Sequence, residues 1–240
     1  MKTSQFDMSL KVYGHFVSQP VRSVLWLLKV SKVEHEFVKV EPMSGHTRTP
    51  EYLAKFPSGK APVIEDGCNN DFRLSEASSI MQYICETRKL DDWYPTSSSK
   101  DRARIHEYLS NHHVTSRRIS VEAFFPFMRA FMKGEIKDWS PSKESRELIQ
   151  NMGNHLATNF LNNSYTGGNG MFIGGRSTPS IADLLAYGEF AQAPLIFDIK
   201  YDNKQVEDWL DACKSIEEHD GVHKSVLKLK EIAIKQGMKL

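Results

Sequence analysis

The chain has 240 residues, of which 40% are hydrophobic and 25% are charged. This composition is typical of a globular protein and excludes a disordered chain, and the length suits two modest domains. The 31 basic and 30 acidic residues leave a formal net charge of +1. Because no broad field of one sign is available, we expect neither nucleic acid nor a membrane surface as a partner.

The cysteines argue against a disulfide framework and against a zinc site. Only Cys68, Cys85 and Cys213 are present, and no Cys-x-x-Cys pair occurs. An odd, scattered set of this kind suits a reducing compartment. Residues 1–9 lack the apolar run of a signal peptide, and no stretch approaches the roughly 18 apolar residues of a membrane span. We therefore expect a cytoplasmic protein without a metal.

The first third of the chain begins with a β-α-β unit. Residues 10–14 alternate with period two, which predicts a short strand. After a loop, apolar residues recur at helical spacing over 20–28, and Ser18 is placed to cap that helix. Residues 35–40 predict a second strand.

A β-β-α unit follows. We expect a short helix at 50–56, strands at 61–65 and 72–74 separated by an Asp66-Gly67 turn, and then a helix capped by Ser75. A parallel pair followed by a hairpin predicts one mixed sheet that carries helices.

The composition changes at a polar segment, residues 91–100, which we interpret as a linker between a domain at 1–90 and a domain at 101–240. Beyond the linker no strand pattern is present, so the second domain is predicted to be all-helical. The expected helices are 102–132 (one or two helices, with a kink at Pro126), 142–161, 180–190, 204–217 and 221–236, with a glycine-rich loop at 164–175.

Ser18 is the first candidate for chemistry. It puts a hydroxyl at the end of a strand-to-helix loop, beside a helix N-terminus, where an anion such as a thiolate is stabilised. Lowering a thiol pKa by about two units requires roughly 2.7 kcal/mol. One hydroxyl hydrogen bond to an anion supplies about 1.5–3 kcal/mol, and the helix end adds to it. The alternative is that Ser18 only caps its helix, which is the commoner role.

Three further motifs have structural interpretations beside functional ones. If the Ala61-Pro62 bond is cis, the backbone of Ala61 turns outward and can pair with an extended peptide. The helix start at 74–80 offers free N–H groups to a carboxylate, or is a solvated serine-rich cap. Ser180 and Asp183 form a capping-box pattern, which is a folding element.

Four segments, taken together, resemble the cytosolic glutathione transferases, and the theta class in particular. They occur in the family's order and at its spacing: Ser18-Gln19-Pro20 with Arg22, Trp93-Tyr94-Pro95, Arg102 to Leu109, and Ser180 to Asp183. The resemblance implies a thioredoxin-like N-terminal α/β domain, an all-helical C-terminal domain and a homodimer.

The resemblance also implies roles for single residues, with glutathione as co-substrate, small apolar electrophiles as second substrates and no metal. Ser18 would be catalytic and hydrogen-bond the glutathione thiolate. The implied glutathione-binding residues are His46 and Lys60 at the glycine end, Ala61 at the cysteinyl backbone, and Glu76 and Ala77 at the γ-glutamyl end.

The sequence departs from the family pattern at two places. Ala77 stands where the family usually has serine, and a lost hydrogen bond to a charged group costs about 1.5–3 kcal/mol, or roughly ten-fold or more in affinity, unless Ser78 compensates. The last helical pattern stops near Gln236, which implies an open electrophile pocket. Its expected wall, or else part of the core, is Phe124, Phe125, Phe127, Met128, Phe131 and Met132.

Three functions are compatible with these residues. The first is conjugation of glutathione to electrophiles, with reduction of organic hydroperoxides as a further activity. The second is a non-catalytic ligand-binding or protein-binding module of the same fold. A thiol oxidoreductase is disfavoured, because no cysteine lies near Ser18 in the sequence. Tyr13 is the rival of Ser18 as the thiolate-binding residue.

Overall fold

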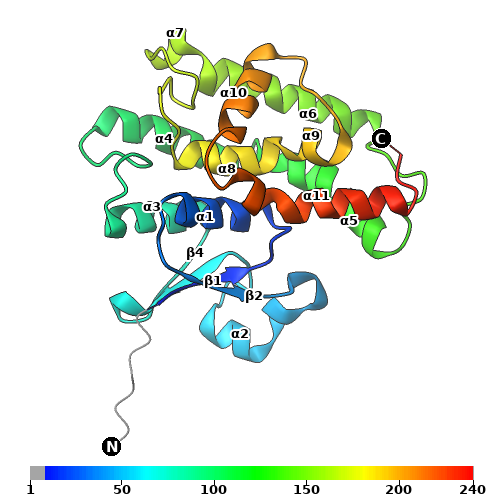
Figure 1. The fold of residues 1–240 in the computed structure, drawn as a ribbon, viewed down its shortest axis with the longest axis horizontal. Helices are drawn as coiled ribbons and strands as arrows, with labels where there is room; N and C mark the ends of the chain where they lie inside the picture. Colours follow the sequence, from blue (N-terminus) through cyan, green and yellow to red (C-terminus); the bar gives the residue numbers. More distant parts are fainter. Residues whose placement is uncertain (1–8, 240) are drawn as a thin grey trace, which may run out of the picture.

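The N-terminal domain is built on a four-stranded mixed sheet (Figure 1). The computed structural model describes residues 9–239. The strands are β1 (Leu10–Gly14), β2 (Glu36–Lys39), β3 (Val63–Asp66) and β4 (Phe72–Ser75). Their order is β2-β1-β3-β4, with β1 parallel to β2 and the other two pairs antiparallel. The predicted parallel pair and hairpin are thus confirmed.

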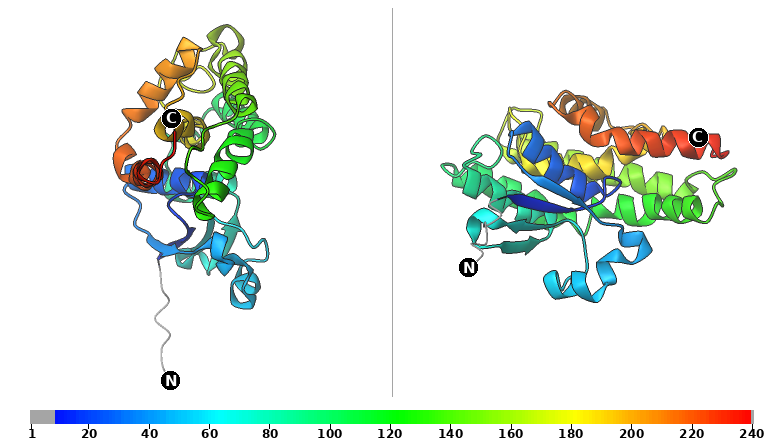
Figure 2. Two further views of the ribbon diagram at one scale, coloured as in Figure 1. Left: turned by 90° about the vertical axis from the view of Figure 1, so that its right-hand side faces the viewer. Right: turned by 60° about the horizontal axis from the view of Figure 1, so that its bottom comes forward.

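Helices cover both faces of the sheet. They are α1 (Gln19–Val30), α2 (Pro50–Lys55) and α3 (Ala77–Arg88). Helices α1 and α3 lie between the sheet and the C-terminal helices, whereas α2 covers the far face (Figures 1 and 2). Successive side chains of a strand point to opposite faces of the sheet, so both faces can be covered. Val12 of β1 belongs to the main core, whereas its neighbour Tyr13 packs against a small cluster around Tyr52 and Phe56.

The C-terminal domain is all-helical over residues 99–239, as expected. Its helices are α4 (Ser99–His112), α5 (Phe125–Met132), α6 (Lys143–Leu156), α7 (Asn163–Thr166), α8 (Ile181–Phe190), α9 (Gln192–Phe197), α10 (Lys204–Lys214) and α11 (His219–Lys235). Two segments are π-helical: Ile119–Phe124 leads directly into α5, and Ala157–Leu161 directly follows α6. None of the helices within residues 9–239 is long and apolar enough to cross a membrane.

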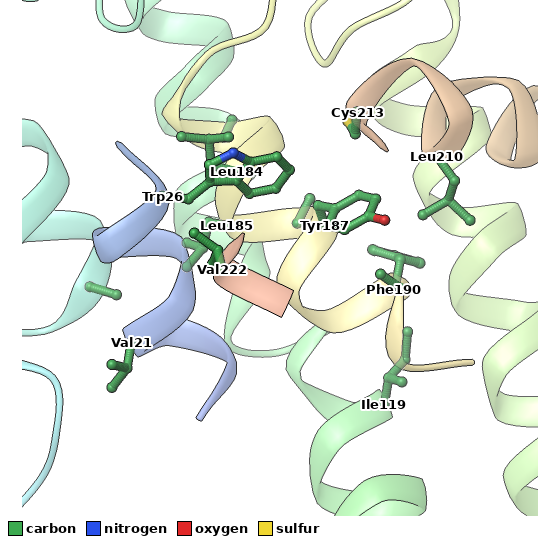
Figure 3. Close-up of a cluster of buried hydrophobic side chains, with 14 of the residues drawn as sticks. Val21, Trp26, Ile119, Leu184, Leu185, Tyr187, Phe190, Leu210, Cys213 and Val222 are labelled. Atoms are coloured by element: carbon green, nitrogen blue, oxygen red, sulfur yellow. The ribbon is translucent and has the colours of Figure 1, made fainter. Parts of the chain in front are cut away.

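The two domains share one core, centred on α8. Every residue of α8 is buried, and the helix packs along α1. Figure 3 shows Trp26 of α1 beside Leu184 and Tyr187 of α8, with Val222 of α11 nearby. The rings of Trp26 and Tyr187 are 5.3 Å apart in an edge-on arrangement. This shared core fixes the position of the loop before α1 relative to the helical domain.

The predicted capping box at the start of α8 is present. The side chain of Ser180 accepts a hydrogen bond from the helix backbone, and Asp183 accepts one from the Ser180 amide at 2.8 Å. Asp183 also accepts hydrogen bonds from the amide of Ile173 and the indole of Trp209. The motif therefore ties three segments of the helical domain together.

Three local expectations were wrong. Ser75 ends β4 and does not cap α3, because the N-cap position is Glu76. The break in the long helical pattern falls at residues 113–116, and Pro126 instead occupies the tolerated first turn of α5. Helix α9 was not foreseen, since the apolar run that contains it continues directly from α8.

Candidate active site

Ser18 occupies the N-cap position of α1, but its side chain does not cap the helix. Its amide donates a hydrogen bond to the carbonyl of His15 at 2.9 Å. Its hydroxyl makes no hydrogen bond to any residue from 9 to 239, and the residue lines a cavity. The hydroxyl is therefore free to bind a ligand at the positive end of α1.

A buried arginine holds the loop that carries Ser18. The guanidinium of Arg22 donates hydrogen bonds to the carbonyls of Val17, at 2.6 Å, and of Phe16, at 3.4 Å. Burial lowers the pKa of Arg22 to about 10, and the nearby carboxylate of Glu189 opposes this shift. Arg22 is thus still charged at neutral pH, and it fixes the two residues before the candidate serine.

The cavity in front of Ser18 has a volume of about 560 Å³ and lies between the two domains. Residues of the N-terminal domain, including Lys60 and Ala61, form one wall. The other wall belongs to the helical domain and contains Phe124, Phe125 and Met128. The same wall also carries Arg117 and Arg129. A polar wall thus faces one that combines apolar side chains with two cations, which suits one peptide-like ligand and one largely apolar ligand.

A second cavity, of about 200 Å³, lies at the start of α3. It is lined by residues from both domains, namely Pro20, Lys60, Ala61, Pro62, Glu76, Ala77, Ser78, His112, His113, Arg117, Leu185 and Glu189. Because Lys60, Ala61 and Arg117 line both cavities, the two are adjacent. The Ala61-Pro62 peptide bond at their junction is cis.

Glu76 stands at the entrance of α3 in an unusual backbone conformation. Its φ is +69°, a region that residues other than glycine rarely adopt. Its carboxylate lies 3.7 Å from the ammonium group of Lys60 and 3.8 Å from the imidazole of His113. Strained residues of this kind are concentrated at functional sites. The first amides of α3, beginning with Ala77, have no partner within the helix and suit a carboxylate.

Arg117 joins the two cavities to a buried polar network. Its guanidinium donates to Glu189 at 2.8 Å and to Gln19 at 3.3 Å. Glu189 also accepts a hydrogen bond from the hydroxyl of Ser120, and Gln19 donates to Gln192. The residue after Ser18 is therefore hydrogen-bonded directly to the helical domain.

The structure separates the remaining candidates. His46 is exposed and lines neither cavity, although the two residues that follow it, Thr47 and Arg48, line the larger one. Tyr13 also lines neither cavity, because its hydroxyl accepts a 2.7 Å hydrogen bond from Lys55 on the far face of the sheet. Of the six expected wall residues, Phe124, Phe125 and Met128 line the larger cavity. The other three do not: Phe127 lies in the core, Phe131 packs against it, and Met132 is exposed.

The cysteines are not part of either cavity. Cys85 and Cys213 are buried, and Cys68 is exposed at another site. Burial raises the pKa of Cys85 to about 12, so that thiol is protonated at neutral pH. No group of side chains within residues 9–239 could hold a metal ion.

Sequence reasoning missed several side chains that line the cavities, among them Arg117, Arg129 and His113. These three belong to the helical domain and reach the cavities only through the packing of the two domains. No local sequence signal marks them, because His113 and Arg129 are exposed and basic side chains are common at exposed positions.

Comparison with known proteins gives the family. The N-terminal domain model of glutathione S-transferases matches residues 8–86. The chain is 30% identical to glutathione S-transferase T1 of Arabidopsis thaliana, over 93% of this chain and 91% of the relative. It is 31% identical to glutathione S-transferase T3 of the same plant over 95% of this chain, but it spans only 39% of that longer protein.

A solved structure agrees with these sequence relatives. The crystal structure of human glutathione transferase theta-2, in complex with glutathione and an unknown ligand, superimposes with a TM-score of 0.75. The match covers 96% of this chain and 93% of the human protein, at 26% identity. The chain therefore belongs to the glutathione transferase family, and its relatives place it in the theta class.

Proposed function

We propose that this protein is a glutathione transferase that binds glutathione as the thiolate through the hydroxyl of Ser18 and adds it to apolar electrophiles. The observation that carries the proposal is the unengaged hydroxyl of Ser18, at the N-terminus of α1 and on the wall of the larger cavity. The family membership supplies the ligand, because the related human theta-2 structure contains glutathione.

In this proposal the tripeptide lies across both cavities. Its γ-glutamyl end enters the smaller cavity. There the backbone amide of Ala77 donates a hydrogen bond to the ligand's α-carboxylate, and the side chain of Glu76 faces the ligand's α-ammonium group. The backbone of Ala61 pairs with the cysteinyl residue. Lys60 lies near the glycine carboxylate of glutathione. Beside the expected His46, we add Arg48 to this end of the site, because Arg48 lines the larger cavity.

The chemistry follows from the position of Ser18. Its hydroxyl donates a hydrogen bond to the thiolate, and the positive end of the α1 dipole further stabilises this negatively charged sulfur. The thiol proton leaves to solvent, and the thiolate attacks an electrophile held against Phe124, Phe125 and Met128. Reduction of organic hydroperoxides would use the same thiolate. It attacks the terminal oxygen, the O–O bond breaks and the alcohol leaves, and a second glutathione converts the resulting sulfenic acid to glutathione disulfide and water.

The test is the titration of glutathione bound to wild-type protein, Ser18→Ala and Tyr13→Phe, followed by the ultraviolet absorbance of the thiolate. We expect Ser18→Ala to raise the thiol pKa by about one to two units, because one hydrogen bond worth about 1.5–3 kcal/mol is lost. Turnover near neutral pH should fall roughly ten- to a hundred-fold and recover in part at higher pH.

Tyr13→Phe is the matched control, because it also removes one hydroxyl but lies on the far face of the sheet. A shift in Tyr13→Phe without one in Ser18→Ala would overturn the serine assignment. If the wild-type protein binds glutathione but shows no thiolate near neutral pH, the non-catalytic binding module becomes the better description.

We further infer a cytoplasmic homodimer. The edge strand β4 is one place where a second chain could pack: its Phe72 is 40% exposed, and the rings of Phe72 and Tyr83 of α3 are 4.9 Å apart in a tilted arrangement. The unpaired backbone groups of an edge strand can pair with another chain. Analytical sedimentation that shows only monomers at micromolar concentration would contradict this inference.

A further inference from the structure

The apolar wall of the larger cavity carries a positive charge at Arg129. Phe125, Met128 and Arg129 all belong to α5 and are spaced by three and four residues, so they share one face of the helix. All three line the cavity that Ser18 faces. An arginine therefore stands beside the two side chains that would hold the apolar part of an electrophile.

The charges around this cavity do not balance. Four permanently cationic side chains line it, Arg48, Lys60, Arg117 and Arg129, against the single carboxylate of Glu41. That carboxylate already has a cationic neighbour, since the ammonium group of Lys39 lies 2.5 Å from it, and the imidazole of His15 lies 3.4 Å away.

Two of the four cations also have acidic partners. Arg117 pairs with Glu189 at 2.8 Å, and Lys60 lies 3.7 Å from Glu76. Arg48 and Arg129 have no acidic partner among residues 9–239. Glutathione offers one carboxylate at its glycine end, which the N-terminal domain wall with Arg48 and Lys60 is placed to receive. Arg129, on the opposite wall, is then left for the second substrate.

We infer that this cavity accepts electrophiles with an apolar body and a carboxylate remote from the reacting carbon, and that Arg129 binds this carboxylate. The inference rests on the proposed function and names the class of its second substrate. Guanidinium groups suit this task because they offer a planar set of donors that matches a carboxylate.

A suitable probe is 4-(chloromethyl)benzoate, with 4-(chloromethyl)benzamide as its neutral counterpart of similar size. In both reactions the glutathione thiolate attacks the benzylic carbon. A C–S bond forms, the C–Cl bond breaks, and chloride leaves with the electron pair. The two compounds differ chiefly in the charge at the far end of the ring, so their ratio of kcat/KM reports on recognition of that group.

We expect the wild-type protein to prefer the benzoate by about three- to ten-fold in kcat/KM, a modest factor because an exposed arginine is screened by water. Arg129→Gln should abolish this preference by raising KM for the benzoate. Lys133→Gln is the matched control, since it removes an exposed cation just after the same helix, outside the cavity.

A binding measurement separates this inference from the proposed function. The products S-(4-carboxybenzyl)glutathione and S-(4-carbamoylbenzyl)glutathione can be titrated calorimetrically, without any turnover. Tighter binding of the carboxylate product that is lost in Arg129→Gln but kept in Lys133→Gln supports the inference even if Ser18→Ala proves active. Equal binding of the two products, or equal losses in both variants, overturns it.

Discussion

The guanidinium of Arg117 lies 2.8 Å from the carboxylate of Glu189, a side chain that is only 1% exposed. The same carboxylate accepts hydrogen bonds from Ser120 and Gln192. A buried charge is tolerated when it is paired and hydrogen-bonded, and removing one partner leaves the others unsatisfied. Because Arg117 lines both cavities, this pair connects the stability of the domain interface to the shape of the site.

We therefore predict that Glu189→Gln lowers the free energy of unfolding by about 1–3 kcal/mol, since a hydrogen-bonded charge is lost while the shape is kept. Glu122→Gln is the matched control, because Glu122 pairs with Arg118 at 2.6 Å on the surface. An exposed pair of that kind contributes at most about 1 kcal/mol. Urea denaturation measures the free energy of unfolding of both variants. Equal losses would mean that the buried pair stabilises the protein no more than the surface pair does.

Ala77→Ser is expected to tighten glutathione binding. Ala77 is the first residue of α3 and lines the smaller cavity, so a hydroxyl there adds one donor to a bound carboxylate. The expected gain is about three- to ten-fold in affinity, below the full value of a charged hydrogen bond because the cavity is open to water. Calorimetric titration with glutathione measures the change.

Ser78→Ala provides the complementary variant for this position. Ser78 lines the same cavity one residue further along the helix. If Ser78 already supplies the missing hydroxyl, Ser78→Ala should weaken binding and Ala77→Ser should change little. That outcome would contradict the prediction and assign the role to Ser78.

The fold was predictable from the sequence because its signals are local. The alternation over Leu10 to Gly14 corresponds to β1, and the helical spacing after Pro20 corresponds to α1. Each pattern can be read from a short stretch of consecutive residues. The site was predictable only where it belongs to such local motifs. Arg117 and Arg129 reach the cavities through packing between domains, which no local pattern reports.

Backbone conformation was the other source of error. The positive φ of Glu76 delays the start of α3 by one residue, so Ser75 remains in β4 and cannot cap the helix. A glutamate gives no sign of this conformation, because it is unfavourable for that residue in isolation. The position becomes intelligible only when the cavity beside it is known.

Asp183 is expected to contribute more to stability than an ordinary capping residue. It is fully buried and accepts hydrogen bonds from the amides of Ser180 and Ile173 and from the indole of Trp209. Asp183→Ala leaves these donors unsatisfied, so we predict a loss of about 2–4 kcal/mol. Glutathione affinity of the folded protein should not change.

The control for this variant is Ser142→Ala, at the exposed N-cap of α6, where the side chain accepts a hydrogen bond from a single amide. An ordinary cap of that kind is worth about 1 kcal/mol. Thermal or urea unfolding distinguishes the two losses. If Asp183→Ala lowers the free energy of unfolding no more than Ser142→Ala does, the hydrogen bonds of Asp183 to Ile173 and Trp209 add no stability beyond helix capping.

The stability of the protein should fall between pH 7 and pH 5 because of two buried histidines. Burial lowers the pKa of His112 to about 3, and burial also places the pKa of His223 well below 6.5. In the unfolded chain both side chains bind a proton near pH 6.5. Below that pH the unfolded state binds more protons than the folded state, so the stabilisation present at higher pH is progressively lost.

Each histidine is expected to contribute a slope of up to about 1.4 kcal/mol per pH unit below pH 6.5. His112→Gln keeps a polar partner for the hydroxyl of Tyr108, which lies 3.1 Å from the imidazole, and His223→Leu replaces a ring with one unpartnered nitrogen. Urea denaturation at pH 7, 6 and 5 should show a shallower decline in each variant and the shallowest decline in the double variant. A decline as steep in the double variant as in the wild-type protein would mean that both histidines become protonated in the folded state, and that their burial does not control the acid sensitivity.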